Sequence, residues 1–311
     1  MSTVICIDGG AGRIVSAVPA LLKYSKLNPN KEWYVVIPGW DVMYWGIPEL
    51  QKRTFDPETK GVFENIFWNA DEVIIPEPYK LPKYYRYELS LAEAFDCLIN
   101  NTDIHDDLPD PIIKLSVQET LIGKEHIYKA KKENKKEKTI VIQPYGSTAA
   151  LYPIGVFDDS MRSIPTNMYN TLVDKLLKNY NVIYFGPREL HDGKTYIPEA
   201  DLDQRSWASI ISECDYFIGC DSCGQHFARA LNKDATVIIG GTHEKNISYP
   251  NHFQIIKRDV ELEPSPLRIS MFQSHLSNRL NEGRISFTDA EIEDTYNAII
   301  KDIKTKSKNK V

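Results

Sequence analysis

The stretch from Tyr216 to Leu231 carries the residues best suited to chemistry. Its apolar start reads as a strand that ends at Gly219, and a helix is expected from about Gly224. Free backbone N–H groups at such a helix start bind anions with the help of the helix dipole, and Ser222 and His226 can add donors. The stretch therefore predicts a phosphate site.

The cysteines of this stretch allow a second interpretation. Cys220 and Cys223 form a C-x-x-C pair, and with Cys214 and His226 they can be drawn as a four-ligand zinc site or a redox pair. The second cysteine pair of a zinc ribbon is missing, and small buried cysteines are common at strand ends, so we favour structural cysteines. Five cysteines are an odd number for a disulfide framework, and we expect reduced thiols.

The N-terminal half alternates strands and helices. An apolar run at 4–7 is followed by the glycine loop 9–12 and by helical spacing over 14–27. Further strands are expected at 33–38 and 72–75, and a further helix at 85–100. Asp8 follows the first of these strands and Asp41 the second.

The C-terminal half repeats the alternation more clearly. Strands are expected at 139–143, 181–185, 215–219 and 235–239, and helices at 167–179, 205–213 and 224–232. Such βα steps predict a parallel, doubly wound sheet, whose ligands bind beyond the carboxyl ends of the strands. A capping box at 288–291 precedes a last amphipathic helix, which packs on its own domain or back on the N-terminal one.

The net charge of −6 is unevenly distributed. Residues 128–138 and 301–311 each carry +4, which leaves −14 on the other 289 residues. We interpret 128–138 as a solvated interdomain linker or the end of a linking helix, with a phosphate-binding arm as the alternative. The predicted domains are therefore 1–135 and 136–311. The acidic body argues against binding of polyanions over the whole surface.

The composition excludes whole classes of protein. Hydrophobic residues make up 42% and charged residues 26%, which excludes disordered and collagen-like chains. No run of 18 apolar residues and no signal-peptide pattern is present, so we expect a soluble cytoplasmic protein. Seven aromatic residues of the N-terminal half are expected mainly in the core, with stacking on a sugar or base as the alternative. They are Trp33, Trp40, Tyr44, Trp45, Phe63, Phe67 and Trp68.

Several motifs together resemble one enzyme family. The pattern D-S-x-x-x-H-x-A-x-A at 221–230 resembles the donor-binding domain of the heptosyltransferase-like glycosyltransferases, glycosyltransferase family nine. The segments 143–147, 162–165 and 186–189 look like this family's glycine loop, basic-proline step and Gly-Pro-x-Glu turn. Near the N-terminus, 12–21 has the family's glycine loop and helix ending in Pro-Ala-Leu.

The resemblance implies a GT-B fold, in which two Rossmann-like domains face each other across a cleft. It also implies metal-independent transfer of a sugar from a nucleotide-diphosphate sugar to an acceptor hydroxyl, with no cofactor and with a lipopolysaccharide-type or other glycan as acceptor. The implied donor-site residues are Gly146, Ser147, Arg162, Gly186, Glu189, Asp221, Ser222, Cys223, Gly224, Gly241 and Thr242. The implied acceptor side includes Gly10, Gly12 and Asp41.

The resemblance also assigns roles within the site. Ser222, the amides of 223–224 and His226 would hold the diphosphate, and Arg162 would offset its charge without a metal. Glu189 would accept a hydrogen bond from the ribose or base. The turn Gly241-Thr242 would approach the diphosphate or the sugar, because glycine permits close backbone approach.

The chain departs from the family pattern in two places. Cys223-Gly224 stands where the family usually has Gly-Pro, and Arg13 stands where the family places its acidic general base. A guanidinium does not accept a proton at neutral pH. We therefore assign the base to Asp8, with Asp41 in reserve, and expect Arg13 to bind an anionic acceptor or the donor phosphates. The predicted catalytic residues are Asp8, Arg13 and His226.

Two other functions remain open from the sequence. A DNA glycosyltransferase acting on a hydroxymethylated pyrimidine would use Arg13 and the basic segments 128–138 and 301–311 on phosphates. A non-catalytic nucleotide-binding module would explain the loss of the acidic base at Arg13. The acidic pair Asp201-x-Asp203 resembles the metal-binding motif of another glycosyltransferase fold, but its place before a helix favours helix capping.

Overall fold

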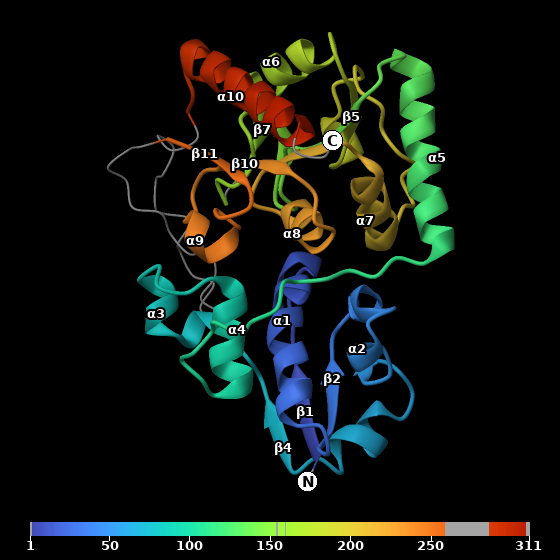
Figure 1. Ribbon diagram of the computed structural model, residues 1–311, viewed down its shortest axis with the longest axis vertical. Coiled ribbons are helices and arrows are strands. Elements are labelled where there is room, and N and C mark those ends of the chain that lie inside the picture. The colour runs from blue at the N-terminus through green and yellow to red at the C-terminus, as the bar shows by residue number, and fades with distance from the viewer. Residues whose placement is uncertain (1, 154, 159, 259–285, 309–311) are drawn as a thin grey trace. The chain divides into compact units, whose positions relative to one another are not determined.

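The computed structural model describes residues 2–153, 155–158, 160–258 and 286–308, and Figure 1 shows their helices and strands. The chain folds into two compact units, Met1–Val117 and Gln118–Val311. Each unit contains one parallel sheet with helices packed against it, so the predicted class of two Rossmann-like α/β units is confirmed. The end of the basic tail, 309–311, lies outside the described residues.

The sheet of the first unit has the strand order β3-β2-β1-β4. Its strands are β1 (Ser2–Cys6), β2 (Glu32–Val36), β3 (Thr54–Phe55) and β4 (Glu72–Ile74). Chain order reverses direction at β1, so the loops after β1 and β4 flank a topological switch point, where α/β sheets bind ligands. The helical segments are α1 (Ala11–Leu27), η1 (Asp41–Tyr44), α2 (Pro48–Gln51), η2 (Phe63–Phe67), η3 (Pro78–Lys80), α3 (Pro82–Tyr85) and α4 (Leu91–Asn100).

The predicted helix over 85–100 begins later than expected. Tyr87 has φ 59°, a left-handed conformation that separates α3 from α4. Ser90 and Glu93 then form a capping box that fixes the start of α4 at Leu91. The local capping signal therefore decides the boundary. Of the aromatic cluster, Trp33 and Tyr44 are core residues, whereas the exposed members are Trp45, Phe63 and Trp68.

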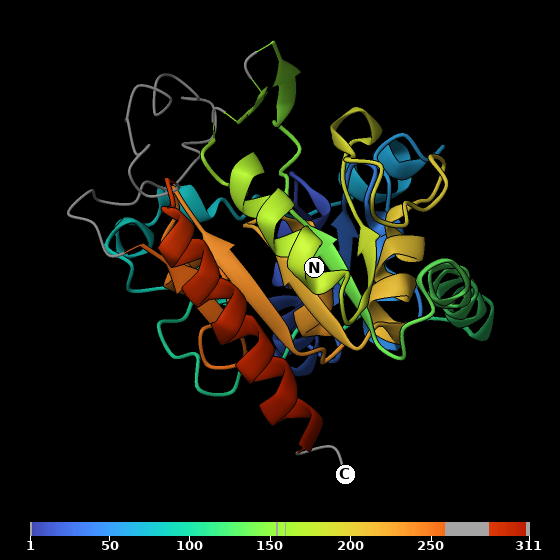
Figure 2. The same cartoon turned by 90° about the horizontal axis from the view of Figure 1, so that it is seen from above.

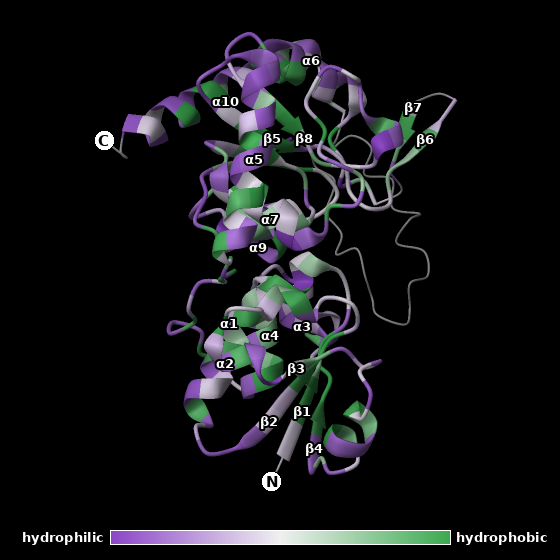
Figure 3. Cartoon of the chain, turned by 90° about the vertical axis from the view of Figure 1, so that its right-hand side faces the viewer, coloured by the Kyte–Doolittle hydropathy of each residue, from purple (hydrophilic) through white to green (hydrophobic). Residues whose placement is uncertain are grey.

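The sheet of the second unit has the strand order β11-β10-β9-β5-β8. Its strands are β5 (Thr139–Gln143), β8 (Asn181–Tyr184), β9 (Tyr216–Gly219), β10 (Ala235–Ile239) and β11 (Gln254–Lys257), and the first four were predicted. β5 and β8 are buried and hydrophobic, as strands covered on both faces are (Figure 3). The switch point of this sheet lies between β5 and β9.

Helices cover the second sheet. On one side α6 and α10 run next to each other (Figure 2) and share a core with β5, β8 and β9, so the last helix packs on its own unit. The Thr288 N–H donates to Glu291 Oε2 and the Glu291 N–H donates to Thr288 Oγ1, which confirms the capping box. The helical segments are α5 (Val117–Asn134), α6 (Thr166–Leu176), η4 (Arg188–Leu190), α7 (Gln204–Glu213), α8 (Cys223–Ala230), α9 (Glu244–Ile247) and α10 (Asp289–Lys308), and β6 (Ala150–Tyr152) pairs with β7 (Gly155–Phe157).

Helix α5 belongs to the second unit, so the observed division lies at the opposite end of this helix from the predicted boundary at 135/136. The Arg205 guanidinium clamps the Glu119 carboxylate with Nε and Nη2. A Cβ on Gly123 would lie 2.4 Å from the Ser209 carbonyl oxygen, so only glycine permits this close packing of α5 on α7. The basic run 128–138 is helical up to Asn134, so of the two interpretations the end of a helix fits it better than a solvated interdomain linker. None of the helices in the described ranges is apolar over enough residues to cross a bilayer.

Candidate functional site

The loops at the switch point of the second sheet meet through Gln143, the last residue of β5. Its side-chain Nε2 donates to Ser222 Oγ at 3.1 Å and lies 3.7 Å from Cys223 Sγ. Its Oε1 accepts the Gly224 N–H at 2.9 Å. A Cβ on Gly224 would lie 2.4 Å from that oxygen, so the contact requires glycine.

This contact changes the expected phosphate site. The sequence suggested that the amides of both 223 and 224 are free at the start of α8, but Gln143 already holds the Gly224 N–H. Ser222 is the N-cap residue, but its side chain accepts no hydrogen bond from the first turn. Its hydroxyl therefore lies at the helix start and does not cap the helix. Of the backbone and hydroxyl donors predicted at this helix start, the Ser222 hydroxyl and the Cys223 amide remain as candidates for an anion.

The loop between β7 and α6 places Arg162 at the same switch point. The Asp158 carboxylate accepts hydrogen bonds from Thr148 Oγ1 at 2.7 Å, from the Ser160 N–H at 2.9 Å and from the Ser163 N–H at 3.1 Å. Burial alone would raise the pKa of Asp158, but the hydrogen bonds from the surrounding hydroxyls outweigh it and lower the pKa. Arg162 Nε donates to Ser160 Oγ at 3.0 Å, so this carboxylate indirectly orients the guanidinium.

The loops that follow β9 and β10 also lie near Arg162. Met161 has φ 51°, and its carbonyl accepts the Gly241 N–H at 2.9 Å. Non-glycine residues in this conformation cost free energy and cluster at ligand-binding sites. Thr242 Oγ1 donates to Asp221 Oδ2 at 2.9 Å. Burial raises the pKa of Asp221, and the charge of Arg162 opposes the rise. The Gly146 N–H donates to Ser163 Oγ at 2.9 Å, so the predicted residues Gly146, Arg162, Asp221, Gly241 and Thr242 lie in one network at the ends of β5, β9 and β10. Ser222 follows Asp221 at the start of α8.

His226 lies inside this unit rather than on its surface. The side chain is 6% exposed, and Nδ1 lies 2.9 Å from the Tyr249 hydroxyl. Burial lowers the pKa of His226 to about 4, so the imidazole is neutral at neutral pH. The sequence predicts that His226 adds a hydrogen-bond donor at the diphosphate, but the imidazole is enclosed and its Nδ1 already pairs with the Tyr249 hydroxyl. The imidazole can orient Tyr249 and the start of α8.

This buried histidine predicts a pH-dependent stability. The folded-state pKa of about 4 lies below the unfolded value of 6.5, so the unfolded chain takes up the proton first as the pH falls. Between about pH 7 and about pH 5, the group should remove about 2 kcal/mol from the free energy of unfolding. Urea unfolding at both pH values should show that His226→Gln loses less stability on acidification than the wild type. Tyr249→Phe should keep the wild-type difference, because burial causes the shift; equal pH dependence in all three proteins would contradict the assignment.

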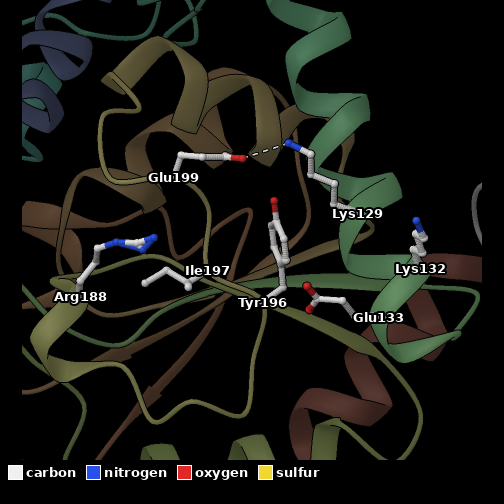
Figure 4. A pocket seen from close by; sticks show the side chains of 7 residues that line it. All are labelled: Lys129, Lys132, Glu133, Arg188, Tyr196, Ile197 and Glu199. Carbon is white, nitrogen blue, oxygen red and sulfur yellow. Dashed lines mark hydrogen bonds and ion pairs between the residues drawn. The ribbon is translucent and has the colours of Figure 1, made fainter.

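The residues expected at the ribose lie at the end of the neighbouring strand β8. Gly186 follows this strand, and Glu189 is exposed in η4. A cavity of about 630 Å³ lies beside η4, and Arg188, Tyr196 and Glu199 are among the residues that line it (Figure 4). Its basic wall comes from α5, where Lys129 is paired with Glu125 and Glu199 at 3.0 Å. The lining includes no residue of the network around Arg162, so we place the candidate site at the strand ends and not in this cavity.

In the first unit, Arg13 bridges the switch point between β1 and β4. Arg13 Nη1 lies 3.1 Å from Glu77 Oε1, Nη2 donates to the Pro76 carbonyl at 3.3 Å, and both charged side chains are about nine-tenths buried. Nη2 also lies 3.5 Å from a carboxylate oxygen of Asp8, whose side chain is 74% exposed. Arg13 is therefore held by the protein itself, and Asp8 is the exposed carboxylate beside it. Gly10 and Gly12 lie at the start of α1, with Gly10 as its N-cap.

Removal of Arg13 should destabilise the first unit strongly. Arg13→Met leaves Glu77 buried without its partner, which should cost about 3 kcal/mol of unfolding free energy. Adding Glu77→Gln should recover most of that loss, because the uncompensated charge disappears. Tryptophan fluorescence during urea unfolding suits this measurement, since Trp33, Trp40, Trp45 and Trp68 all lie in the first unit. Additive losses in the double variant would show that the two side chains do not act as a pair.

Asp41 is the other carboxylate at the strand ends of the first unit. It begins η1 directly after β2, the neighbour of β1, and is partly buried. Burial raises the pKa of Asp41, which makes it a stronger base than an ordinary aspartate. The two candidate bases therefore differ in environment: Asp8 is exposed beside Arg13, and Asp41 is partly buried.

The structure also bears on two alternative metal or redox sites, at the cysteines and at the acidic pair before α7. Cys214 and Cys220 are buried, and burial raises the pKa of Cys223, which disfavours the reactive thiolate of a redox pair. Asp203 is the N-cap of α7 and accepts the Ser206 N–H at 2.7 Å, as expected for helix capping. No group of three His, Cys, Asp or Glu side chains able to hold a metal ion occurs among the described residues.

Some residues of the site escaped the sequence analysis. Gln143 begins the segment 143–147 but was assigned no role there, Glu77 belongs to no motif, and the partners of both are distant in sequence. The run Asp158 to Ser163 did carry a signal, because aspartate and serine side chains tend to bind nearby backbone amides. That signal indicates a structured turn but does not identify its function.

Comparison with known proteins identifies the fold. No family model and no curated protein sequence matches this chain. A structure of a glycosyl transferase family 9 protein from Veillonella parvula DSM 2008 superposes with TM-score 0.63 at 14% identity, covering 82% of this chain and 85% of its own. The E. coli ADP-heptose LPS heptosyltransferase II gives TM-score 0.61 at 14% identity, covering 83% and 91%. The iron-containing dodecameric glycosyltransferase TibC from enterotoxigenic E. coli H10407 gives 0.62 at 11%, covering 96% and 76%. The chain therefore has the GT-B fold of the heptosyltransferase-like family 9 glycosyltransferases.

Proposed function

We propose that this protein is a glycosyltransferase that moves a sugar from a nucleoside-diphosphate sugar to an acceptor hydroxyl. The observation that carries the proposal is the placement of Arg162. Asp158 and Ser160 orient its guanidinium in the same strand-end network as the start of α8. A fixed cation and helix-start donors at one switch point suit a diphosphate leaving group.

In this proposal the second unit binds the donor. Arg162 offsets the negative charge that develops on the diphosphate, and Ser222 Oγ and the Cys223 N–H donate to its oxygens. The turn at Gly241 and Thr242 lies against the diphosphate or the sugar. The exposed Glu189 accepts a hydrogen bond from the ribose or base. Stabilisation of the leaving group is the largest catalytic contribution expected of these residues.

The acceptor hydroxyl needs a base, which we assign to Asp8 of the first unit. Its carboxylate is exposed and lies beside the fixed Arg13 guanidinium. Asp41 is the reserve, because partial burial raises its pKa. Asp8 takes the proton of the acceptor hydroxyl as the bond to the sugar forms, and the nucleoside diphosphate leaves.

The neighbours suggest which substrates to test first. Heptosyltransferase II is named for ADP-heptose and lipopolysaccharide, and one TibC structure, at TM-score 0.58, is a complex with ADP-D-β-D-heptose. We therefore propose an ADP-linked sugar as donor and a lipopolysaccharide-type glycan as acceptor. The free cysteines and the use of a nucleotide sugar favour the cytoplasm as the place of reaction. We further propose that Arg162 makes a metal unnecessary, so turnover should survive EDTA.

Incubation with ADP-, UDP- and GDP-sugars tests the function. Release of nucleoside diphosphate, even slowly into water, supports the enzyme, whereas tight binding without turnover identifies a binding module. Glycans and hydroxymethylated DNA offered in parallel, with mass spectrometry of the products, then decide the acceptor. Failure to bind any nucleotide sugar would refute the proposal.

A further inference from the structure

A cysteine, a histidine and an aspartate meet in the first unit, away from the residues assigned above. Cys97 Sγ lies 3.4 Å from His105 Nε2, and His105 Nδ1 lies 2.7 Å from Asp96 Oδ2. Asp96 and Cys97 are consecutive residues of α4, and His105 lies in the loop that follows this helix. The order thiol, imidazole, carboxylate is that of a nucleophile, its base and the group that orients the base.

The protein holds this arrangement in place from several sides. Lys23 of α1 donates to the Ile104 carbonyl at 2.9 Å and to Asp96 Oδ2 at 3.1 Å. Asp96 is fully buried, and its Oδ1 accepts from Asn100 Nδ2 at 2.7 Å. The loop is thereby folded back onto α4 with the His105 ring only 11% exposed. The geometry is thus fixed by buried contacts rather than by a chance rotamer.

The contacts of the imidazole define its chemistry. The Asp96 carboxylate accepts from Nδ1–H, which leaves the Nε2 lone pair directed at the Cys97 thiol. Cys97 is only partly buried, so its sulfur remains within reach of a small reagent. Burial and then the charge of Asp103 raise the pKa of Cys97, and Lys83 of α3 partly opposes them. The thiol therefore stays protonated and depends on a base when it attacks.

We propose that Cys97 is a nucleophilic thiol that exchanges with small disulfides, with His105 as its base and Asp96 as the positioning residue. The thiol proton moves to His105 Nε2 while Sγ forms a new bond to one sulfur of the disulfide. The old S–S bond breaks, and the departing thiolate takes the proton back from the imidazolium. Cys97 is oxidised, the departing sulfur is reduced, and the protein carries a mixed disulfide. Exchange at sulfur requires no oxyanion-binding donors, which an acyl transfer would need.

The surrounding charge selects among disulfides. The carboxylates near the thiol are Asp96 and Glu93 of α4 and Asp103 and Asp107 of the loop, and the amines are Lys23 and Lys83. Carboxylates thus outnumber amines, so a cationic disulfide should react faster than an anionic one. Cystamine and oxidised glutathione provide the two charges.

The full-length protein tests this proposal through labelling at each cysteine. Iodoacetamide or cystamine is added for a series of times, and peptide mass spectrometry gives one rate per cysteine. Cys97 should react faster than the other partly buried thiols, Cys6 and Cys223, and far faster than the buried Cys214 and Cys220. His105→Gln should slow Cys97 by about 10-fold to 100-fold and leave the other cysteines unchanged. His191→Gln, a matched change in the second unit, should leave the Cys97 rate intact.

Two results would overturn the proposal. One is a Cys97 rate no higher than that of Cys6, and the other is an unchanged rate in His105→Gln. The wild type supplies a readout that no folding defect affects, which is the pH dependence of alkylation. A thiol without a base loses reactivity tenfold per pH unit below its pKa, so such a profile at Cys97 would also refute a base at His105. A shallower profile supports it.

Discussion

Replacing Arg162 by glutamine should lower kcat/KM for the nucleotide sugar by about 10² to 10³, because the guanidinium is the charge that meets the leaving diphosphate. Arg162→Lys should recover only part of this loss, since an ammonium lacks the planar fork that binds two oxygens at once. Initial rates of nucleoside-diphosphate release measure the effect. The free energy of unfolding should also fall, because a hydrogen bond to Ser160 Oγ is lost and the buried Asp221 loses the charge that opposes its burial, so urea unfolding is measured beside the rates.

The control for this experiment is an arginine of the first unit. The Arg86 side chain is 65% exposed and lies outside the candidate site, so Arg86→Gln should leave the rate unchanged. Normal turnover by Arg162→Gln would contradict the proposed donor site, because that proposal depends on the Arg162 guanidinium. Weaker nucleotide binding with an unchanged kcat would assign Arg162 to binding alone.

Asp8→Asn should lower kcat for sugar transfer by about 10² to 10⁴, since an amide does not accept the acceptor proton. The slow release of nucleoside diphosphate into water without acceptor should change little, because it depends on the second unit. Comparing the two rates therefore separates the base from the donor site. The measurement needs only the donor, the acceptor found in the parallel screen and a product assay.

Two further variants make this result specific. Asp41→Asn should be nearly silent if Asp8 is the base, and the reverse outcome would transfer the role to Asp41. Asp106 is exposed in the same unit and has no assigned part, so Asp106→Asn controls for the loss of a surface charge. Full activity in both the Asp8 and the Asp41 variant would place the base elsewhere.

The sequence predicted the central strands well because their signal is local. β5 and β10 have the expected bounds, since each is a short, mainly apolar run buried on both faces, preceded by a charged residue and followed by Pro144 or Gly240. The caps at Asp203 and Thr288 were equally clear, because the capping side chain lies three residues from the amide that it binds.

The residues that shape the site were harder to predict because their partners are distant in sequence. Gln143 binds the Gly224 amide across 81 residues, and Arg13 binds Glu77 across 64. Both residues lie in recognisable segments, 143–147 and 12–21, but no local pattern identifies the distant partner that each of them binds. The sequence identified the strand ends where ligands bind but not which helix-start donors the protein uses for itself. Only the folded structure shows that the Gly224 amide is taken and that His226 is enclosed.

The docking of α5 has a practical consequence for dissecting the protein. A C-terminal fragment cut at the charge-rich segment, near residue 136, would lack the helix that carries Glu119. Arg205, which is 4% exposed, would keep its charge inside the fragment without the carboxylate that clamps it. Such a fragment should aggregate or unfold, whereas one that begins shortly before Val117 retains its own covering helix. Nucleotide-binding studies on the isolated second unit should therefore start in the irregular segment 111–116, directly before this helix.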